Sequence, residues 1–194
     1  MTDQIEFKIF TKKNGFRLTN NIVVYSLLFC SLSIAYLANR HLEESTIENI
    51  AKVVGVFACV LMIYFKIAQS FKRESLNGDL NKTIIFKPTE IVVAERKYSL
   101  DEIKKIEFYI GDYFDKWEYK VKGDLNSART NGKSNICNLL LTNGEIIETR
   151  FQLMYKGEFL RMRELLLEYY SYNKIHFLKL IEFRNLQIRR NTRI

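Results

Sequence analysis

The chain has little of the residues that break, loosen or cross-link a fold. Its 194 residues include only 1 Pro, 8 Gly and 3 Cys. A single proline excludes collagen-like and proline-rich repeats, and the low glycine content leaves little room for a flexible linker. An odd, sparse set of cysteines argues against a disulfide framework. The 2 His residues belong to no Cys/His cluster, so we expect no zinc site.

Sequence motifs of the common enzyme classes are also missing. The chain has no G-x-S-x-G, H-E-x-x-H, Walker A or G-x-G-x-x-G sequence. Asp112 and Asp115 are close enough to form a carboxylate pair, but a stretch such as GDYFDK is typical of a turn. We therefore predict a protein that is not an enzyme and has no cofactor or metal.

Long apolar runs, by contrast, are concentrated in the first third of the chain. Ile22 to Ala38 is 17 residues without a charge, which as a helix spans roughly 25 Å. A second run, Val53 to Phe65, extends to Ile50–Ala68 if Lys52 and Lys66 reach the membrane interfaces with their ammonium groups. We predict a transmembrane helical hairpin over residues 22–71. The alternative is a buried helical hairpin in a soluble protein.

Basic residues around the two runs predict the orientation of the hairpin. They precede the first run at Lys8, Lys12, Lys13 and Arg17 and follow the second at Lys66, Lys72 and Arg73. The loop between the runs has Arg40 and Lys52 but is acidic at Glu43, Glu44 and Glu48. We therefore expect a multi-pass protein of the bacterial inner (cytoplasmic) membrane with both termini in the cytosol. Cys30 and Cys59 would then lie in the membrane, and Cys137 in a reducing compartment.

Small residues within the two runs suggest helix association. Ser31 and Ala35 are four residues apart, as are Ala51 and Gly55. This spacing lets transmembrane helices approach closely. It favours a homo-oligomer that assembles through the membrane, although packing of the hairpin against itself needs the same kind of contact.

Residues 75–172 are expected to form a mostly-β cytosolic domain. Apolar and β-branched residues predict strands at Thr83–Lys87, Glu90–Glu95, Lys97–Leu100, Ile103–Ile110, Trp117–Lys122, Asn135–Thr142 and Glu145–Leu153. Asn143-Gly144 is a strong hairpin turn sequence. The helical spacing of Phe159, Met162, Leu166 and Tyr169 then predicts one C-terminal helix. The expected fold is a small barrel or bent sheet of about 6–8 antiparallel strands. Residues 1–21 are taken as a separate cytosolic segment.

The last residues, 173–194, form a basic segment with interleaved apolar side chains. From Lys174 to Ile194 there are 6 basic residues against 1 acidic one, a net charge of +5 out of +8 for the whole chain. Such a tail suits anionic lipid headgroups; the residues proposed to face lipid are Lys179, Arg184, Arg189, Arg190 and Arg193. A packed helix with a solvated basic face is the alternative. We expect no nucleic-acid polymer as a partner, because no recognised nucleic-acid motif is present.

One polar stretch suggests a small anionic ligand. Residues 126–135 (NSARTNGKSN) include Arg129, Asn131 and Lys133, whose cations and turn amides suit a phosphate. Aromatic residues that stack bases lie close by in sequence at Tyr109, Tyr113, Trp117 and Tyr119, and Arg150 follows on a later strand. A solvent-exposed hairpin loop with core aromatics nearby is the alternative.

The order of these segments resembles two families. Ile84-Ile85-Phe86, Ile91-Val92-Val93 and Tyr98 to Ile103, within residues 80–171, resemble the strands of bacterial PH-like membrane proteins. The same plan is similar to the two-span membrane β-barrel effectors of CBASS anti-phage systems. The second resemblance implies a barrel that binds a cyclic dinucleotide messenger and drives transmembrane assembly that disrupts the inner membrane.

Two functions are therefore predicted from the sequence. The first is a membrane-anchored sensor and effector in anti-phage defence, gated by a cyclic-nucleotide-type messenger. Such gating requires the messenger to bind one state of the protein more tightly than the other. The alternative is a constitutive membrane-tethered PH-like module that binds lipid headgroups or a protein partner.

Overall fold

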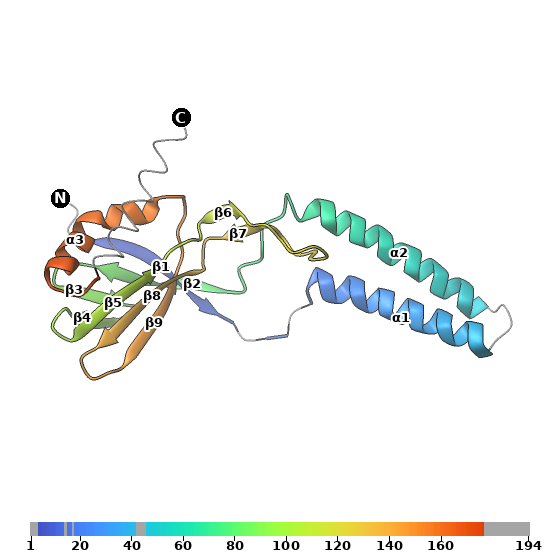
Figure 1. Ribbon diagram of the computed structural model, residues 1–194, viewed down its shortest axis with the longest axis horizontal. Helices are drawn as coiled ribbons and strands as arrows, with labels where there is room; N and C mark the ends of the chain where they lie inside the picture. Colours follow the sequence, from blue (N-terminus) through green and yellow to red (C-terminus); the bar gives the residue numbers. More distant parts are fainter. Residues whose placement is uncertain (1–3, 14, 17, 42–45, 177–194) are drawn as a thin grey trace, which may run out of the picture. The chain divides into compact units, whose positions relative to one another are not determined.

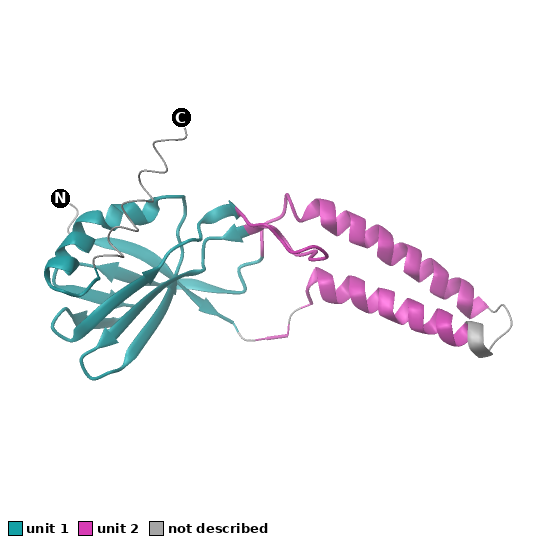
Figure 2. Cartoon of the chain, in the orientation of Figure 1, with its two compact units in different colours: residues 1–13, 75–116, 130–194 teal, residues 14–74, 117–129 magenta. Residues whose placement is uncertain are grey.

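A computed structural model describes residues 4–13, 15–16, 18–41 and 46–176. The chain divides into two compact units (Figure 2). The β unit contains residues 1–13, 75–116 and 130–194, and the hairpin unit contains residues 14–74 and 117–129. The expected fold class is confirmed: two apolar N-terminal helices accompany an antiparallel sheet and a C-terminal helix.

A seven-stranded antiparallel sheet forms the β unit (Figure 1). Its strands are β1 (Ile5–Lys12), β2 (Gly78–Phe86), β3 (Glu90–Val93), β4 (Arg96–Ser99), β5 (Ile103–Tyr109), β8 (Asn135–Leu141) and β9 (Ile146–Phe151). Their order is β4-β3-β2-β1-β9-β8-β5, so β4 and β5 are its two ends. The strands β6 (Phe114–Trp117) and β7 (Arg129–Asn131) pair separately with each other. Strands β1 to β4 form an antiparallel meander, and β9, β8 and β5 extend the sheet from the other side of β1. Together with the C-terminal helix, this sheet fits the PH-like description.

Most strands lie where the alternation of apolar residues predicts them. In β8, every second side chain from Asn135 to Leu141 is buried, as expected for a strand with one face on the core. The predicted hairpin between β8 and β9 turns at Asn143-Gly144, where Gly144 has a φ of 88°.

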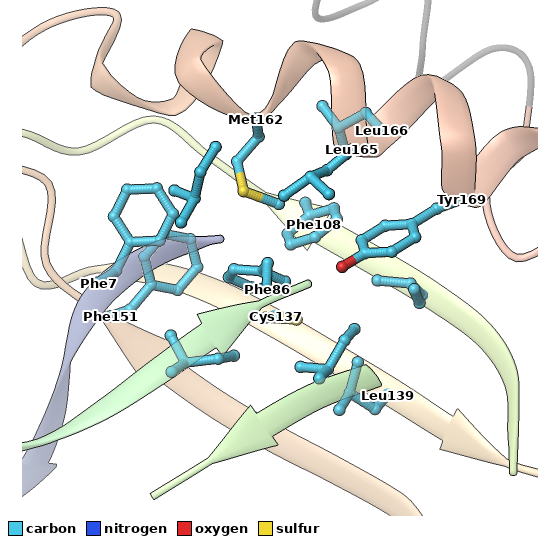
Figure 3. Close-up of a cluster of buried hydrophobic side chains, with 14 of the residues drawn as sticks. Phe7, Phe86, Phe108, Cys137, Leu139, Phe151, Met162, Leu165, Leu166 and Tyr169 are labelled. Atoms are coloured by element: carbon cyan, nitrogen blue, oxygen red, sulfur yellow. The ribbon is translucent and has the colours of Figure 1, made fainter. Parts of the chain in front are cut away.

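The C-terminal helix covers the core face of the sheet (Figure 3). It consists of a 3-10 turn at Glu158–Met162 followed by α3 (Arg163–Ser171). Met162, Leu166 and Tyr169 from this segment are buried in one cluster with side chains of the sheet such as Phe86 and Phe108. The Tyr169 hydroxyl donates a hydrogen bond to the Lys87 carbonyl at 2.7 Å. Burial raises the pKa of both Tyr169 and the Cys137 thiol, so both groups stay neutral in the core.

The N-terminal residues contribute a strand to the sheet. The separate segment predicted over residues 1–21 instead contains β1 (Ile5–Lys12), which lies between β2 and β9. Ile5, Phe7 and Ile9 are buried while Glu6 and Lys8 are exposed. The alternation is visible in the sequence, but its partner β2 begins at Gly78. The helical hairpin is therefore an insertion between two neighbouring strands of one sheet.

The two predicted apolar segments form long helices. α1 (Asn20–His41) and α2 (Thr46–Ala68) run side by side (Figure 1). Asn20–Ala38 and Thr46–Ala68 are each long and apolar enough to cross a membrane. Only 17% and 11% of their most apolar stretches are buried, whereas a core helix of a soluble protein is mostly buried.

The predicted strand at Trp117–Lys122 is wrong beyond its first residue. β6 ends at Trp117, and Tyr119 and Val121 are exposed rather than half-buried. The alternation of apolar and charged residues is present, but this part of the chain forms a loop and has no neighbouring strand on which to bury its apolar side.

Candidate functional site

The contact between α1 and α2 is built from small residues. The Ser31 hydroxyl donates a buried hydrogen bond to the Ala51 carbonyl at 2.8 Å. One helical turn along α2, a Cβ atom at Gly55 would lie 2.7 Å from the Ser31 Oγ, so any larger residue there would displace the Ser31 hydroxyl. Ala51 and Ala58 are also buried in the hairpin, and Ala35 is half-buried. These contacts lie within one chain, so the predicted assembly between chains stays a prediction.

Large apolar side chains point away from this contact. Phe29, Leu32 and Val53 are each about 70% exposed, at 73%, 69% and 69%. The same is true along both helices, at Tyr36, Leu37, Ile50, Val56, Phe57, Val60, Ile63 and Ile67. Among the described residues of the two helices, the buried ones are Val24 and the small residues Ser31, Ala38, Ala51 and Ala58. Mostly small side chains inside and large ones outside is the reverse of a soluble core and is typical of helices that face lipid.

A loop from the second half of the chain is fastened to the start of α1. We call residues 117–129, which run from the last residue of β6 to the first residue of β7, the capping loop (Figure 2). Asn21 donates to the Asp124 carboxylate at 3.1 Å and accepts from the Leu125 backbone N–H at 2.7 Å. Asn20 donates to the Leu125 carbonyl at 2.9 Å, and the Tyr25 hydroxyl donates to the Gly123 carbonyl at 2.7 Å.

The same loop binds the end of α2. The Ala128 N–H donates to the Gln69 carbonyl at 2.9 Å, and the Arg129 Nε donates to the Ser70 carbonyl at 3.0 Å. Lys66 Nζ reaches the Asp124 carbonyl at 3.4 Å. Leu125 and Ala128 are buried. The capping loop thus joins the two ends of the hairpin that are farthest from the α1–α2 connection.

Asp124 holds the centre of the capping loop. Burial of its carboxyl by itself raises the pKa, but hydrogen bonds from the Asn126 backbone and from the Asn21 and Asn126 side chains outweigh it. The pKa of Asp124 is therefore below its ordinary value, and the carboxylate stays ionised in the loop.

Much of the polar stretch predicted to bind a ligand, residues 126–135, is buried and hydrogen-bonded within the fold. Asn131 is buried, and its carbonyl accepts from the Gln152 side chain at 2.8 Å. Gly132 has a φ of +69°, and a Cβ there would come within 2.2 Å of the Leu153 carbonyl oxygen. The side chain of Asn135 accepts from the backbone N–H of Gly111 and donates to the carbonyl of Gly132.

The Asp112 carboxylate is hydrogen-bonded to a hydroxyl and a backbone N–H rather than paired with a second carboxylate. Asp112 is buried and accepts from the Thr130 hydroxyl at 2.6 Å and from the Ser134 N–H at 3.0 Å. These contacts join Asp112 to residues 18 and 22 positions away rather than within a local turn, and Asp115 lies in β6 with a positive φ of 67°.

The two predicted cations of this stretch bind carbonyl groups. Arg129 belongs to the hairpin unit and donates to Ser70, as described above. Lys133 belongs to the β unit, where its Nζ lies 3.4 and 3.3 Å from the carbonyls of Ser75 and Leu76 and 5.2 Å from the ring centre of Phe10. Lys133 therefore fastens the chain where it re-enters the sheet at β2.

The predicted aromatic residues divide between the two units. In the hairpin unit, the rings of Trp117 and Tyr119 meet edge to face with centroids 6.4 Å apart. In the β unit, Tyr109 and Arg150 both pair with Ile136, so they share the outer face of the sheet. Their polar atoms contact Glu107 and Glu148, which offsets the positive charge of Arg150.

The described part of the β unit has two cavities of interest. One, of about 400 Å³, is lined by Lys104, Lys105, Tyr170, Lys174 and His176 among others. The sequence analysis missed it because its lysines come from β5 and from the segment after α3. The other, of about 160 Å³, is mainly apolar and includes Tyr113, Leu153 and Phe159. Among the residues with defined positions, no group of three or more His, Cys, Asp or Glu side chains could hold a metal ion.

The basic tail residues proposed to face lipid, Lys179, Arg184, Arg189, Arg190 and Arg193, lie outside the described residues. Comparison of the chain with known protein families, curated proteins and solved structures finds no match.

Proposed function

We propose that this protein is a two-span membrane protein whose β unit works as a PH-like interaction module at the membrane surface. The observation that carries the proposal is the inside-out hairpin: small residues such as Ser31 and Gly55 face the helix contact, while Phe29 and Val53 face outward. In water such a continuous apolar surface would cause aggregation. In a bilayer it is the favoured surface.

The topology of the sheet supports the membrane orientation. Lys12 pairs with Gly78, and the Lys13 N–H donates to the Asn77 carbonyl at 3.1 Å. The two stems of the hairpin therefore leave from adjacent strands. Because a paired antiparallel sheet of this kind is not divided by a bilayer, both stems lie on one side of the membrane. A hairpin that starts and ends on one side has an even number of spans, in agreement with two.

The β unit has chemistry suited to an anionic partner. The cavity between β5 and the segment after α3 carries three lysines and a histidine, although Lys174 donates to the Ile103 carbonyl and Lys105 pairs with Glu107. Lipid headgroups or an acidic segment of a protein are the partners that this surface favours.

Accessibility of single cysteines from each side of the membrane tests the proposal. Cys30 and Cys59 are replaced by Ser in the full chain, Cys137 stays because it is buried, and one of Glu6, Thr46 or Asn143 becomes Cys. In sealed vesicles, an impermeant maleimide should label positions 6 and 143 from the same side and position 46 only from the other. Labelling of all three from one side would contradict the proposal.

The ligand-gated effector of anti-phage defence remains a second proposal. One observation supports it: the capping loop connects the strands β6 and β7 to both helix bases. A ligand that moves these strands would change the hairpin and, through its outer faces, the association of chains.

Titration of the full chain in nanodiscs with cyclic dinucleotides tests this second proposal. We expect saturable binding and a shift from monomers to oligomers. No saturable binding at micromolar concentrations would exclude the messenger, and binding without a change of oligomeric state would exclude the assembly step. The full chain is required because residues 75–194 alone lack strand β1.

A further inference from the structure

The capping loop presents an unusual surface for a loop. Trp117, Tyr119 and Val121 are 56%, 82% and 75% exposed, although all three are large or apolar. Among the residues that alternate with them, Lys122 is exposed, whereas the Lys120 side chain is only 22% exposed and pairs with Glu118 at 3.6 Å. Exposed aromatic side chains next to an exposed lysine match the region of a bilayer where headgroups meet acyl chains.

Hydrogen bonds hold the capping loop at the end of the hairpin where α1 begins and α2 ends. Asp124 and Leu125 bind Asn21, next to the first residue of α1, and Ala128 binds Gln69, next to the last residue of α2. The tip reaches further, because Gly123 binds the hydroxyl of Tyr25. Tyr25 lies 25 − 20 = 5 residues beyond the start of α1, which is about 7–8 Å along the helix axis.

Other exposed aromatic residues lie at the same end of the hairpin. Phe16 precedes α1 and is 87% exposed, and Phe71 follows α2 and is 77% exposed. Lys72, next to Phe71, reaches the hydroxyl of Tyr64 at 3.5 Å. Three segments of the hairpin unit thus bring exposed aromatic residues to the ends of the spans, and two of these segments also carry exposed lysines, Lys72 and Lys122.

We propose that the capping loop is a membrane-interface anchor, in which Trp117, Tyr119 and Val121 enter the headgroup region of the bilayer and Lys122 contacts anionic headgroups. This rests on the proposed membrane hairpin. The loop then fixes the depth of the hairpin in the membrane, although in the sequence it lies between the strands β6 and β7.

Trp117 is the single tryptophan of the chain and so reports directly on the loop. The full chain is reconstituted in vesicles of phosphatidylcholine with phosphatidylglycerol. Tryptophan fluorescence is measured on the protein that floats with the vesicles. We expect tryptophan emission shifted to shorter wavelength, quenching by lipids brominated near the headgroup greater than by lipids brominated deep in the acyl chain, and protection from aqueous acrylamide.

Three outcomes separate the two proposals. Protein that does not float with the vesicles overturns both the membrane hairpin and the anchor. Protein that floats but whose Trp117 is open to acrylamide and insensitive to brominated lipids overturns the anchor alone. Protein that floats with Trp117 quenched from the headgroup region supports the anchor.

A charge reversal tests the role of the exposed lysine. Lys122→Glu should reduce the extra quenching that phosphatidylglycerol gives over pure phosphatidylcholine. The control, Lys82→Glu, makes the same change in charge at an exposed position of β2. An equal effect of both variants would overturn the contact of Lys122 with anionic headgroups.

Discussion

The β unit and the helical hairpin place their large apolar side chains in opposite ways. In the β unit, Phe86 and Phe108 are fully buried under α3, and most charged residues, with exceptions such as Asp112, lie outside. In the hairpin, Phe29 is exposed and the contact between helices is made by Ser31 and Gly55. The β unit is organised by water, which drives large apolar groups inward. The hairpin has the pattern expected where lipid replaces water and only close packing and hydrogen bonds hold helices together.

Truncation of a phenylalanine in each region should produce the largest contrast. Phe86→Ala leaves a cavity in the β core and should cost about 3–5 kcal/mol of the free energy of unfolding. Phe29→Ala removes a side chain that contacts no core and should change it by less than about 0.5 kcal/mol. Denaturant unfolding of the full chain in micelles, followed by circular dichroism, measures both. Equal losses would mean that the outer face of α1 is packed against protein.

Enlarging Gly55 should be the next largest effect. Gly55→Leu forces a side chain against the Ser31 hydroxyl and should destabilise the hairpin by roughly 1–3 kcal/mol. Val56→Leu, at the neighbouring exposed position, is the matched control and should have almost no effect. Limited proteolysis of the hairpin in micelles reports the difference. Faster cleavage of both variants would show that the two faces of α2 are not distinct.

Loss of the hydrogen bond between Ser31 and Ala51 in the hairpin contact should have a smaller effect on stability. Ser31→Ala removes the donor to the Ala51 carbonyl, and bonds of this kind between membrane helices contribute about 0.6 kcal/mol. Ser26→Ala, at an exposed position of the same helix, controls for loss of a hydroxyl. Amide hydrogen exchange near Ala51 should accelerate in the first variant only.

Acid should have the smallest effect, confined to the capping loop. The pKa of Asp124 is lower in the folded chain than its ordinary value of 3.8, so its stabilising contribution is present above about pH 4. That contribution is lost as the pH falls through the lower, folded value. Hydrogen exchange at Leu125 and Asn126 should therefore increase at acid pH, and Asp124→Asn should remove this pH dependence. An unchanged pH dependence in Asp124→Asn would assign it to another group.

Local patterns in the sequence predicted much of the fold but little of the site. The spans follow from runs of apolar residues, and the β8–β9 hairpin follows from Asn143-Gly144. The pairing of β1 with β2 was missed because the whole helical hairpin separates them. The contact between Asn20 and Leu125 joins residues 105 positions apart, and no local pattern predicts it. The proposed ligand residues were grouped by sequence distance, but the fold divides them between two units.

Thiol reactivity in sealed vesicles tests the central claim most directly. Cys30 and Cys59 are exposed on the helices, whereas Cys137 is buried in the β unit. If the hairpin lies in lipid, a maleimide polymer added to the full chain in intact vesicles should form no adduct, and all three cysteines should react in denaturing detergent. Adducts at Cys30 and Cys59 in intact vesicles would show that water covers the hairpin and would contradict the account.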